Sequence, residues 1–249
     1  SKGRHDEALK IMIKIDGKDL AELQMAEIEE MVNAEKGGIK ELLQPFLRVP
    51  LWIGILLPIF SHLSGIAAIM YFAPNIINES IQSVENAFLG AVMVGVINCL
   101  FTFVAINNIE KFGRRKLLLI GVTGAFISLS GVSFLFAVES KFVIVPLLMY
   151  VASFAFSFGP IVWVIISEIF PTHIRGLAVS LGSFSLMLTG FVITLTNPIL
   201  IQTVMPSGTF LIYAILVLPA IWFIWKFIPE TKGKSLEEIE KYWRIKYKQ

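Results

Sequence analysis

The sequence has little charge and almost no cysteine, and both shortages narrow the possible classes of protein. Only 16% of its 249 residues are charged and 55% are hydrophobic, whereas in soluble domains roughly a quarter of the residues are charged. The net charge of +2 gives no argument for a nucleic-acid partner. A single cysteine, Cys99, excludes an intrachain disulfide and a cysteine-rich metal site, and we expect it to be a small buried apolar residue.

The hydrophobic residues gather into six apolar blocks, at about 51–77, 87–109, 117–138, 142–170, 177–201 and 209–228. Each block is long enough to cross the ~30 Å hydrocarbon core of a bilayer as a helix. The blocks lack the short alternating segments of barrel strands, and lipid cannot hydrogen-bond an open backbone. The sequence therefore predicts an all-α membrane protein with a bundle of six transmembrane helices over residues 49–228.

Charged segments flank the six blocks. In residues 1–48 apolar residues recur three and four apart, which predicts a helical linker segment outside the membrane. Residues 229–249 form a charged tail, in which Ser235 and Glu238 have the spacing of a helix capping box. The first 48 residues are rich in charge, which excludes a signal peptide there. The sequence begins at Ser1 without an initiator methionine, so we expect it to be a piece of a longer protein.

Lysine and arginine collect on one side of the predicted bundle. Residues 1–48 carry eight of them, 110–116 four, 171–176 one and 226–249 seven, whereas the three opposite loops hold only Lys141. Loops rich in lysine and arginine are cytoplasmic as a rule. We therefore expect a multi-pass protein of the cell membrane, with both ends of this chain in the cytoplasm.

A few polar side chains lie inside the apolar blocks, where an ionisable group costs about 2.5–3.5 kcal/mol. The main ones are His62, Asn98 and Glu168, with Ser61 and Trp163 as milder cases. Such residues usually face a bundle interior or a cavity, which favours a place on a solute pathway. For Asn98 the alternative is a hydrogen bond that only holds two helices together.

Small residues and a proline stand inside two of the blocks. Gly159-Pro160 lies in the middle of the fourth block, where proline removes a helical hydrogen bond and predicts a break. Broken helices at membrane depth commonly line transport sites, although a static packing kink is the alternative. Ser64 and Gly65 in the first block are equally consistent with a close contact between helices.

Charged residues gather at the predicted cytoplasmic end of the bundle. Glu110, Arg114 and Arg115 lie in the turn after the second block, Glu168 ends the fourth block, and Arg175 begins the fifth. Arginine presents a planar fork that matches a carboxylate, so these residues can pair across helix ends. We expect a network that holds one conformation and breaks in another. The alternative is the general preference for lysine and arginine in cytoplasmic loops, which explains the arginines but not Glu168.

Five short segments follow one another along the chain: 64–74 (SGIAAIMYFAP), 111–115 (KFGRR), 159–163 (GPIVW), 167–171 (SEIFP) with Arg175, and 229–233 (PETKG). In this order and spacing they resemble the second half of the sugar porter family of the major facilitator superfamily. The resemblance implies one half of a twelve-helix fold, with six upstream helices missing. It further implies a secondary transporter, a symporter or uniporter, that moves a sugar or related small polar solute by alternating access.

The resemblance also carries site roles to matching positions. In that family, polar groups on the first, second, fourth and fifth spans of this half hold the sugar; Asn98 and Trp163 match, and Gly159 would let the fourth span bend. Tyr71 matches the first aromatic residue of an outer gate, and Phe72 stands where the second would be. We also assign Glu230, in the PETKG segment, to the network of Glu110, Glu168 and the arginines.

The chain departs from the family at other sugar-binding positions. Ser61 and His62 replace paired glutamines, Ala67 replaces an asparagine, and Leu186-Met187 replaces an amide–tryptophan pair. Because sugars are recognised through dense hydrogen bonding, a less hydroxylated solute and a non-transporting nutrient sensor remain alternatives. No nucleophile–base pair, metal cluster or phosphate loop is visible, so neither an enzyme nor a cofactor is predicted. The expected partners are the solute, the lipid bilayer and the missing six-helix half.

Overall fold

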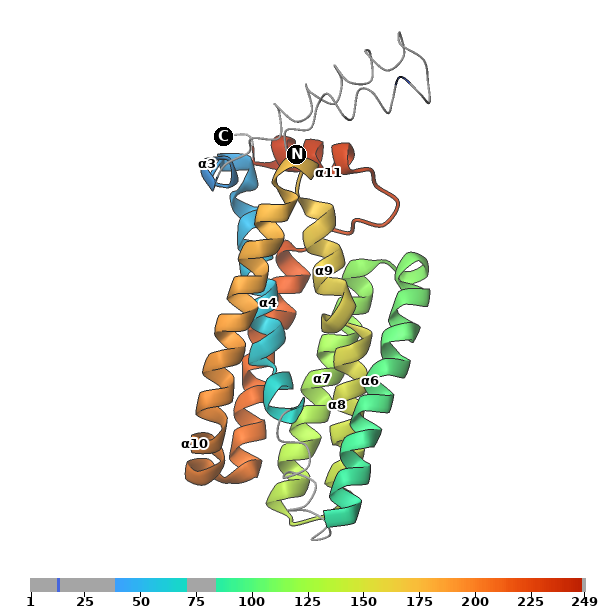
Figure 1. The fold of residues 1–249 in the computed structure, drawn as a ribbon, viewed down its shortest axis with the longest axis vertical. Helices are drawn as coiled ribbons and strands as arrows, with labels where there is room; N and C mark the ends of the chain where they lie inside the picture. The colour runs from blue at the N-terminus through green and yellow to red at the C-terminus, as the bar shows by residue number, and fades with distance from the viewer. Residues whose placement is uncertain (1–12, 14–38, 71–83, 248–249) are drawn as a thin grey trace.

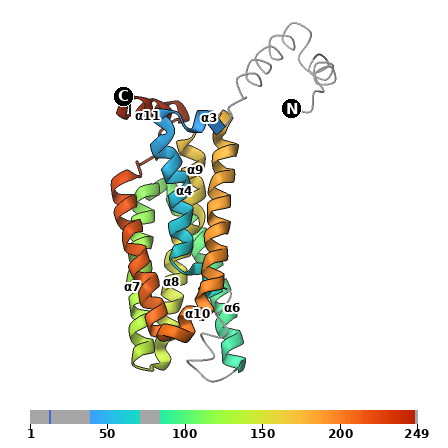
Figure 2. The same ribbon diagram turned by 90° about the vertical axis from the view of Figure 1, so that its left-hand side faces the viewer.

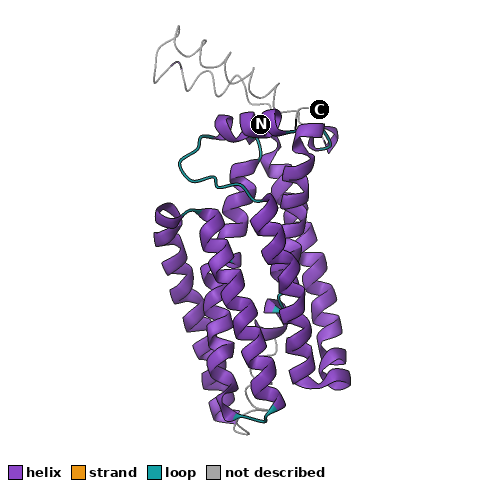
Figure 3. Cartoon of the chain, turned by 180° about the vertical axis from the view of Figure 1, so that it is seen from behind, coloured by secondary structure: helices purple, strands orange, loops and turns teal. Residues whose placement is uncertain are grey.

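The computed structural model describes residue 13 and residues 39–70 and 84–247. Long helices run side by side in one bundle (Figure 1), and all regular structure within these residues is helical (Figure 3). Five of the described helices are long and apolar enough to cross a membrane. The all-α membrane bundle predicted from the sequence is confirmed. Most of the linker segment predicted over 1–48 lies outside the described residues.

The helices follow the predicted blocks, and most boundaries shift by a few residues; the end of the first block, predicted at 77, lies outside the described residues. In chain order the described elements are α3 (Ile39–Leu42), the 3-10 turn η1 (Pro45–Leu47), α4 (Arg48–Leu63), α6 (Val84–Phe112), α7 (Arg114–Ala137), the 3-10 turn η2 (Lys141–Val143), α8 (Ile144–Phe156), α9 (Phe158–Ile169), α10 (Thr172–Phe227) and α11 (Leu236–Lys246).

Helix α10 supplies two of the six predicted spans. At Met205 the backbone leaves the helical region (φ 62°, ψ 167°), and the chain reverses direction there, so that the parts before and after it run back along the bundle in opposite directions (Figures 1 and 2). We call residues 172–204 the first arm and 206–227 the second arm. The hydroxyl of Tyr213 in the second arm donates to Asn197 Oδ1 in the first arm at 2.9 Å. Within residues 39–70 and 84–247, the bundle therefore makes six passes.

The first span is interrupted at Ser64 and Gly65. Helix α4 ends at Leu63, Gly65 has a φ of 85°, and helical structure resumes at 66–70. That positive φ favours glycine. A Cβ built on Gly65 would also lie 2.6 Å from Cδ2 of Tyr213, so no side chain fits there. The close helix contact considered from the sequence is present at this break.

The fourth span is broken, as Gly159-Pro160 predicts. The non-helical residue is Ser157 (φ −126°, ψ −86°), which separates α8 from α9. Pro160 has no N–H to offer the carbonyl of Phe156, the last residue of α8, so the helix cannot run through. A Cβ built on Gly121 of α7 would lie 2.2 Å from Cβ of Ser157, which shows how closely α7 packs on the break.

Helix α6 keeps much of its apolar surface outside the bundle. Leu89, Val96, Leu100 and Phe103 are all exposed, and so is Cys99, which the sequence had suggested would be buried. A contiguous apolar face of this kind suits hydrocarbon or a further layer of helices. Cys99 therefore lies on the outer surface of the chain rather than in its core.

Helices α3 and α11 lie across one end of the bundle (Figure 1). Ser235 Oγ accepts from the Glu238 amide at 3.2 Å, and Glu238 Oε2 accepts from the Ser235 amide at 2.8 Å. The predicted capping box is thus confirmed. Trp243 of α11 is buried, and the guanidinium of Arg244 lies 4.1 Å from the ring centre of Phe46 in η1. The tail helix is consequently packed against the start of the first span.

Candidate functional site

Arg114 is a buried cation at the first position of α7, near the α11 end of the bundle. Gly113 (φ 86°) alone separates α6 from α7, so Glu110 and Arg114 come from opposite sides of a one-residue turn. Helix α9 brings Glu168 in its last turn, and the segment 228–235 after α10 runs past the same point. Segments far apart in the sequence therefore meet around one guanidinium.

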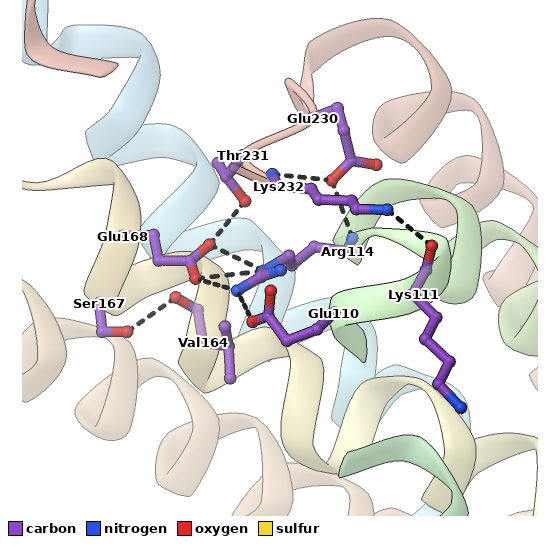
Figure 4. Close-up of polar contacts among 9 residues, drawn as sticks. All are labelled: Glu110, Lys111, Arg114, Val164, Ser167, Glu168, Glu230, Thr231 and Lys232. Carbon is purple, nitrogen blue, oxygen red and sulfur yellow. Dashed lines mark hydrogen bonds and ion pairs between the residues drawn. The ribbon is translucent and has the colours of Figure 1, made fainter. Parts of the chain in front are cut away.

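The guanidinium of Arg114 forms ion pairs with two carboxylates (Figure 4). Its Nε donates to both oxygens of Glu168 at 3.1 and 3.2 Å, and its Nη2 donates to Glu168 Oε1 at 2.8 Å and to Glu110. Thr231 donates its hydroxyl proton to Glu168 Oε2 at 2.6 Å. The side chains of Arg114 and Glu168 are 8% and 22% exposed, against 69% for Glu110. The buried pair is therefore Arg114–Glu168, with Glu110 on the open side.

Glu230 holds the beginning of α7 through backbone contacts. Its Oε1 accepts from the Arg114 amide at 2.9 Å and its Oε2 from the Arg115 amide at 3.2 Å. A carboxylate there satisfies amides that lack helical partners and complements the helix dipole. A Cβ built on Gly113 would lie 2.5 Å from Glu230 Oε2, so the turn needs glycine. We call Arg114, Glu110, Glu168, Glu230 and Thr231 the Arg114 cluster.

Two arginines that the sequence placed in the network lie outside the ion pairs. The guanidinium of Arg115 donates to the carbonyl of Trp225, and that of Arg175 donates to Thr172 Oγ1 at 3.4 Å. Of the three arginines, Arg114 is the one that pairs with Glu168. Sequence reasoning missed Thr231, although its place beside Glu230 in the PETKG segment was an available signal.

His62 lies on α4 and packs against the first arm of α10. A Cβ built on Gly190 would lie 2.7 Å from Cδ2 of His62, so the imidazole rests on the backbone of that glycine. Its Nδ1 is buried and has no hydrogen-bond partner among the described residues. Ser61 and Ala67, the neighbouring candidates, are buried on the two sides of the break in the first span.

The remaining solute candidates lie on neighbouring helices. Asn98 on α6 is half-buried, as are Gly159 and Trp163 on α9. Helix α9, which carries Trp163, contacts both α4, which carries His62, and α6, which carries Asn98. The two predicted outer-gate aromatics, Tyr71 and Phe72, lie outside the described residues, and so their arrangement stays a prediction. Within the part of the chain that the structure describes, no cluster of His, Cys, Asp and Glu could hold a metal ion.

In the part of the chain that the structure describes, six helical passes, two of them broken, and a buried ion-pair cluster at one end of the bundle are features of a membrane transport protein. The chain belongs to the sugar transporter family, because the family model described as "Sugar (and other) transporter" matches residues 1–243. This is a family of transporters, as the sequence predicted, and not of enzymes.

Individual relatives agree with the family assignment. The chain is 38% identical over 245 residues to the arabinose-proton symporter of Bacillus subtilis, covering 97% of this chain and 53% of that protein. It is 35% identical over 251 residues to the D-xylose-proton symporter of Escherichia coli, covering 98% and 51%. The solved structure of the proton:xylose symporter XylE bound to 6-bromo-6-deoxy-D-glucose matches with a TM-score of 0.77 and 35% identity, covering 97% of this chain and 52% of that one. The chain thus spans about half the length of these relatives.

Proposed function

We propose that this chain is the C-terminal six-helix half of a secondary transporter that moves a sugar or a related small polar solute by alternating access. The observation that carries the proposal is the Arg114 cluster, in a chain whose relatives are sugar-proton symporters. A buried ion pair contributes little net stability, because desolvation offsets the Coulomb attraction. Such a pair is better suited to distinguishing two conformations than to holding one fold together.

In this proposal an upstream six-helix half completes the cavity, and the two halves rock about a central site. Coverage of about half of each relative supports this arrangement. The excess of lysine and arginine on the α11 end supports a cytoplasmic location for that end. The Arg114 cluster, whose members all lie in this half, would then hold the ends of α7 and α9 together in one state, and its ion pairs would separate in the other state as those helix ends move apart.

Solute would contact His62, Asn98 and Trp163, with Ser61 and Ala67 nearby and Gly159 in the broken part of the fourth span. The strongest support comes from His62, since its buried Nδ1 lacks a partner within the described residues. An unpaired buried polar atom is costly unless a ligand or water satisfies it. A solute hydroxyl is the kind of group that would do so.

The test is uptake by the full-length protein in proteoliposomes, with labelled L-arabinose and D-xylose as first substrates. Saturable uptake of either sugar, competed by the unlabelled sugar, is the expected result. A protein that binds a sugar without moving it would instead be a nutrient sensor on the same scaffold. The apolar residues Ala67, Leu186 and Met187 favour a second candidate, a less hydroxylated solute, which competition with deoxy sugars would reveal.

A further inference from the structure

The break in the first span leaves carbonyl oxygens at the end of α4 that need partners from outside the helix. The Gly65 amide donates to the carbonyl of His62 at 3.0 Å, three residues back. The carbonyl of Ser61 instead accepts the hydroxyl of Ser64 at 2.6 Å. The carbonyl of Ser64 accepts the hydroxyl of Tyr150, which reaches it from α8, at 2.9 Å. A side chain from another helix thus satisfies the backbone at the break.

The contact between Tyr150 and the break is buried. The phenol donates its proton to the carbonyl of Ser64, and the phenol oxygen also lies 2.8 Å from Ser64 Oγ, whose own proton goes to the carbonyl of Ser61. Ser64 and Tyr150 are fully buried, and Ser61 is 3% exposed. No water competes in such surroundings, and an unmade hydrogen bond there costs the full desolvation of its groups. The Tyr150 hydroxyl therefore holds the backbone at Ser64 firmly.

A second tyrosine touches the same break in a different way. The ring of Tyr213 packs on Gly65, but its hydroxyl donates to Asn197 Oδ1 at 2.9 Å, away from the break. Glycine at a φ of 85° adopts many backbone conformations at similar energy, so Gly65 itself does not fix the angle between the two helical parts. Of these two tyrosines, only Tyr150 hydrogen-bonds the backbone at the break.

We propose that Tyr150 is a positioning residue for the solute site. Its hydroxyl fixes the direction of the helix that resumes at Ile66 relative to α4. It thereby sets how His62, before the break, lies relative to Ala67, after it. The role of those two residues rests on the proposed function, whereas the hold on the break does not.

The structural test compares Tyr150→Phe with the matched control Tyr213→Phe by hydrogen exchange of the intact protein in lipid nanodiscs. Each change removes one buried phenol hydroxyl and keeps the ring. Tyr150→Phe is expected to speed amide exchange at 65–69 by roughly tenfold, since one hydrogen bond to the break is lost. Tyr213→Phe is expected to leave that segment at the wild-type rate. Equal exchange at 65–69 in wild type and Tyr150→Phe, or equal acceleration by both variants, would overturn the proposal.

If Tyr150→Phe does not reach the membrane folded, 4-fluorophenylalanine at position 150 carries the same test, because it keeps the ring and fills the place of the hydroxyl but has no proton to donate to the carbonyl of Ser64. Faster exchange at 65–69 in this variant than in the wild type supports the proposal, and unchanged exchange refutes it.

Sugar uptake separates the positioning role from the proposed function. If arabinose or xylose is transported, Tyr150→Phe is expected to raise KM several-fold while the maximal rate changes less, because the site is less well ordered before the solute binds. Tyr213→Phe should leave KM unchanged. A lower maximal rate at constant KM would remove the link to the solute site. Should the wild type transport neither sugar while the exchange result holds, the proposed function fails and the hold of Tyr150 on the break stands.

Discussion

Replacing Glu168 with Gln removes one charge from the buried pair in the Arg114 cluster. Leaving a buried ion without its partner costs about 3–5 kcal/mol. Glu168 is 22% exposed and Glu110 still contacts the guanidinium, while a glutamine oxygen can accept one of the lost hydrogen bonds. We therefore expect a cost of about 2 kcal/mol to the state in which the pair is formed. That corresponds to a roughly 30-fold shift of the conformational equilibrium toward the opened state.

The assay is the rate at which a thiol reagent, added on the α11 side, labels a single cysteine in the full-length protein. Cys99 is exposed and is first replaced by Ser; the reporter is Ser167→Cys, a half-buried position beside Glu168. Glu168→Gln should speed labelling by up to roughly 30-fold. Arg175→Gln is the control, because the guanidinium of Arg175 contacts Thr172 and not the Arg114 cluster.

The effects of changing Glu168 and Arg114 should also be non-additive. Glu168→Gln combined with Arg114→Ala should change the labelling rate by less than the sum of the single effects in free energy, because the second change removes the cation that the first leaves unpaired. Additive effects, or labelling equal to that of the wild type, would refute the argument that this cluster distinguishes two states. The arginines at this end of the bundle would then be explained only by the general preference for positive charge on the cytoplasmic side.

Three further predictions follow from the bundle. Gly121→Ala should destabilise the protein by about 2 kcal/mol or more, since its Cβ would meet Ser157, and thermal unfolding should show it; Gly176→Ala, where a Cβ meets nothing within 4 Å, should not. His62→Gln should change the preference among sugars and flatten the pH dependence of uptake, because imidazole changes charge near neutral pH; an unchanged profile would make His62 structural. The chain expressed alone should give no uptake, whereas co-expression with an upstream half should restore it, so robust uptake by the chain alone would contradict the proposed architecture.

Much of the fold was predictable because membrane helices are specified by local sequence. The six apolar blocks, the break near Gly159-Pro160 and the capping box at Ser235 each depend on residues close together in the chain, and each was confirmed. The exact boundary residues were less predictable. The fourth span breaks at Ser157, which packs closely against Gly121 on α7. The local sequence around Ser157 does not predict that contact.

The candidate site was predictable only in part, because contacts between distant segments decide which side chains meet. Charge and position alone grouped Arg175 with Glu168, but the orientation of each side chain depends on tertiary packing, and Arg175 contacts Thr172 instead. The backbone contacts of Glu230 with α7 depend on how the chain returns after α10, more than 100 residues further on. The contact between Tyr150 and Ser64 also depends on how distant helices pack. Neither residue carries a charge or belongs to a motif that would predict this contact.

The hydrogen bond between Tyr213 and Asn197 has a consequence for the way the chain enters the bilayer. An asparagine side chain inserted alone into hydrocarbon has an amide without a partner, which is costly. Because the two arms of α10 are joined at Met205 and place Tyr213 beside Asn197, they can satisfy part of that need before any other helix arrives. We therefore expect the last two spans to enter the membrane together as a helical hairpin, and not one after the other.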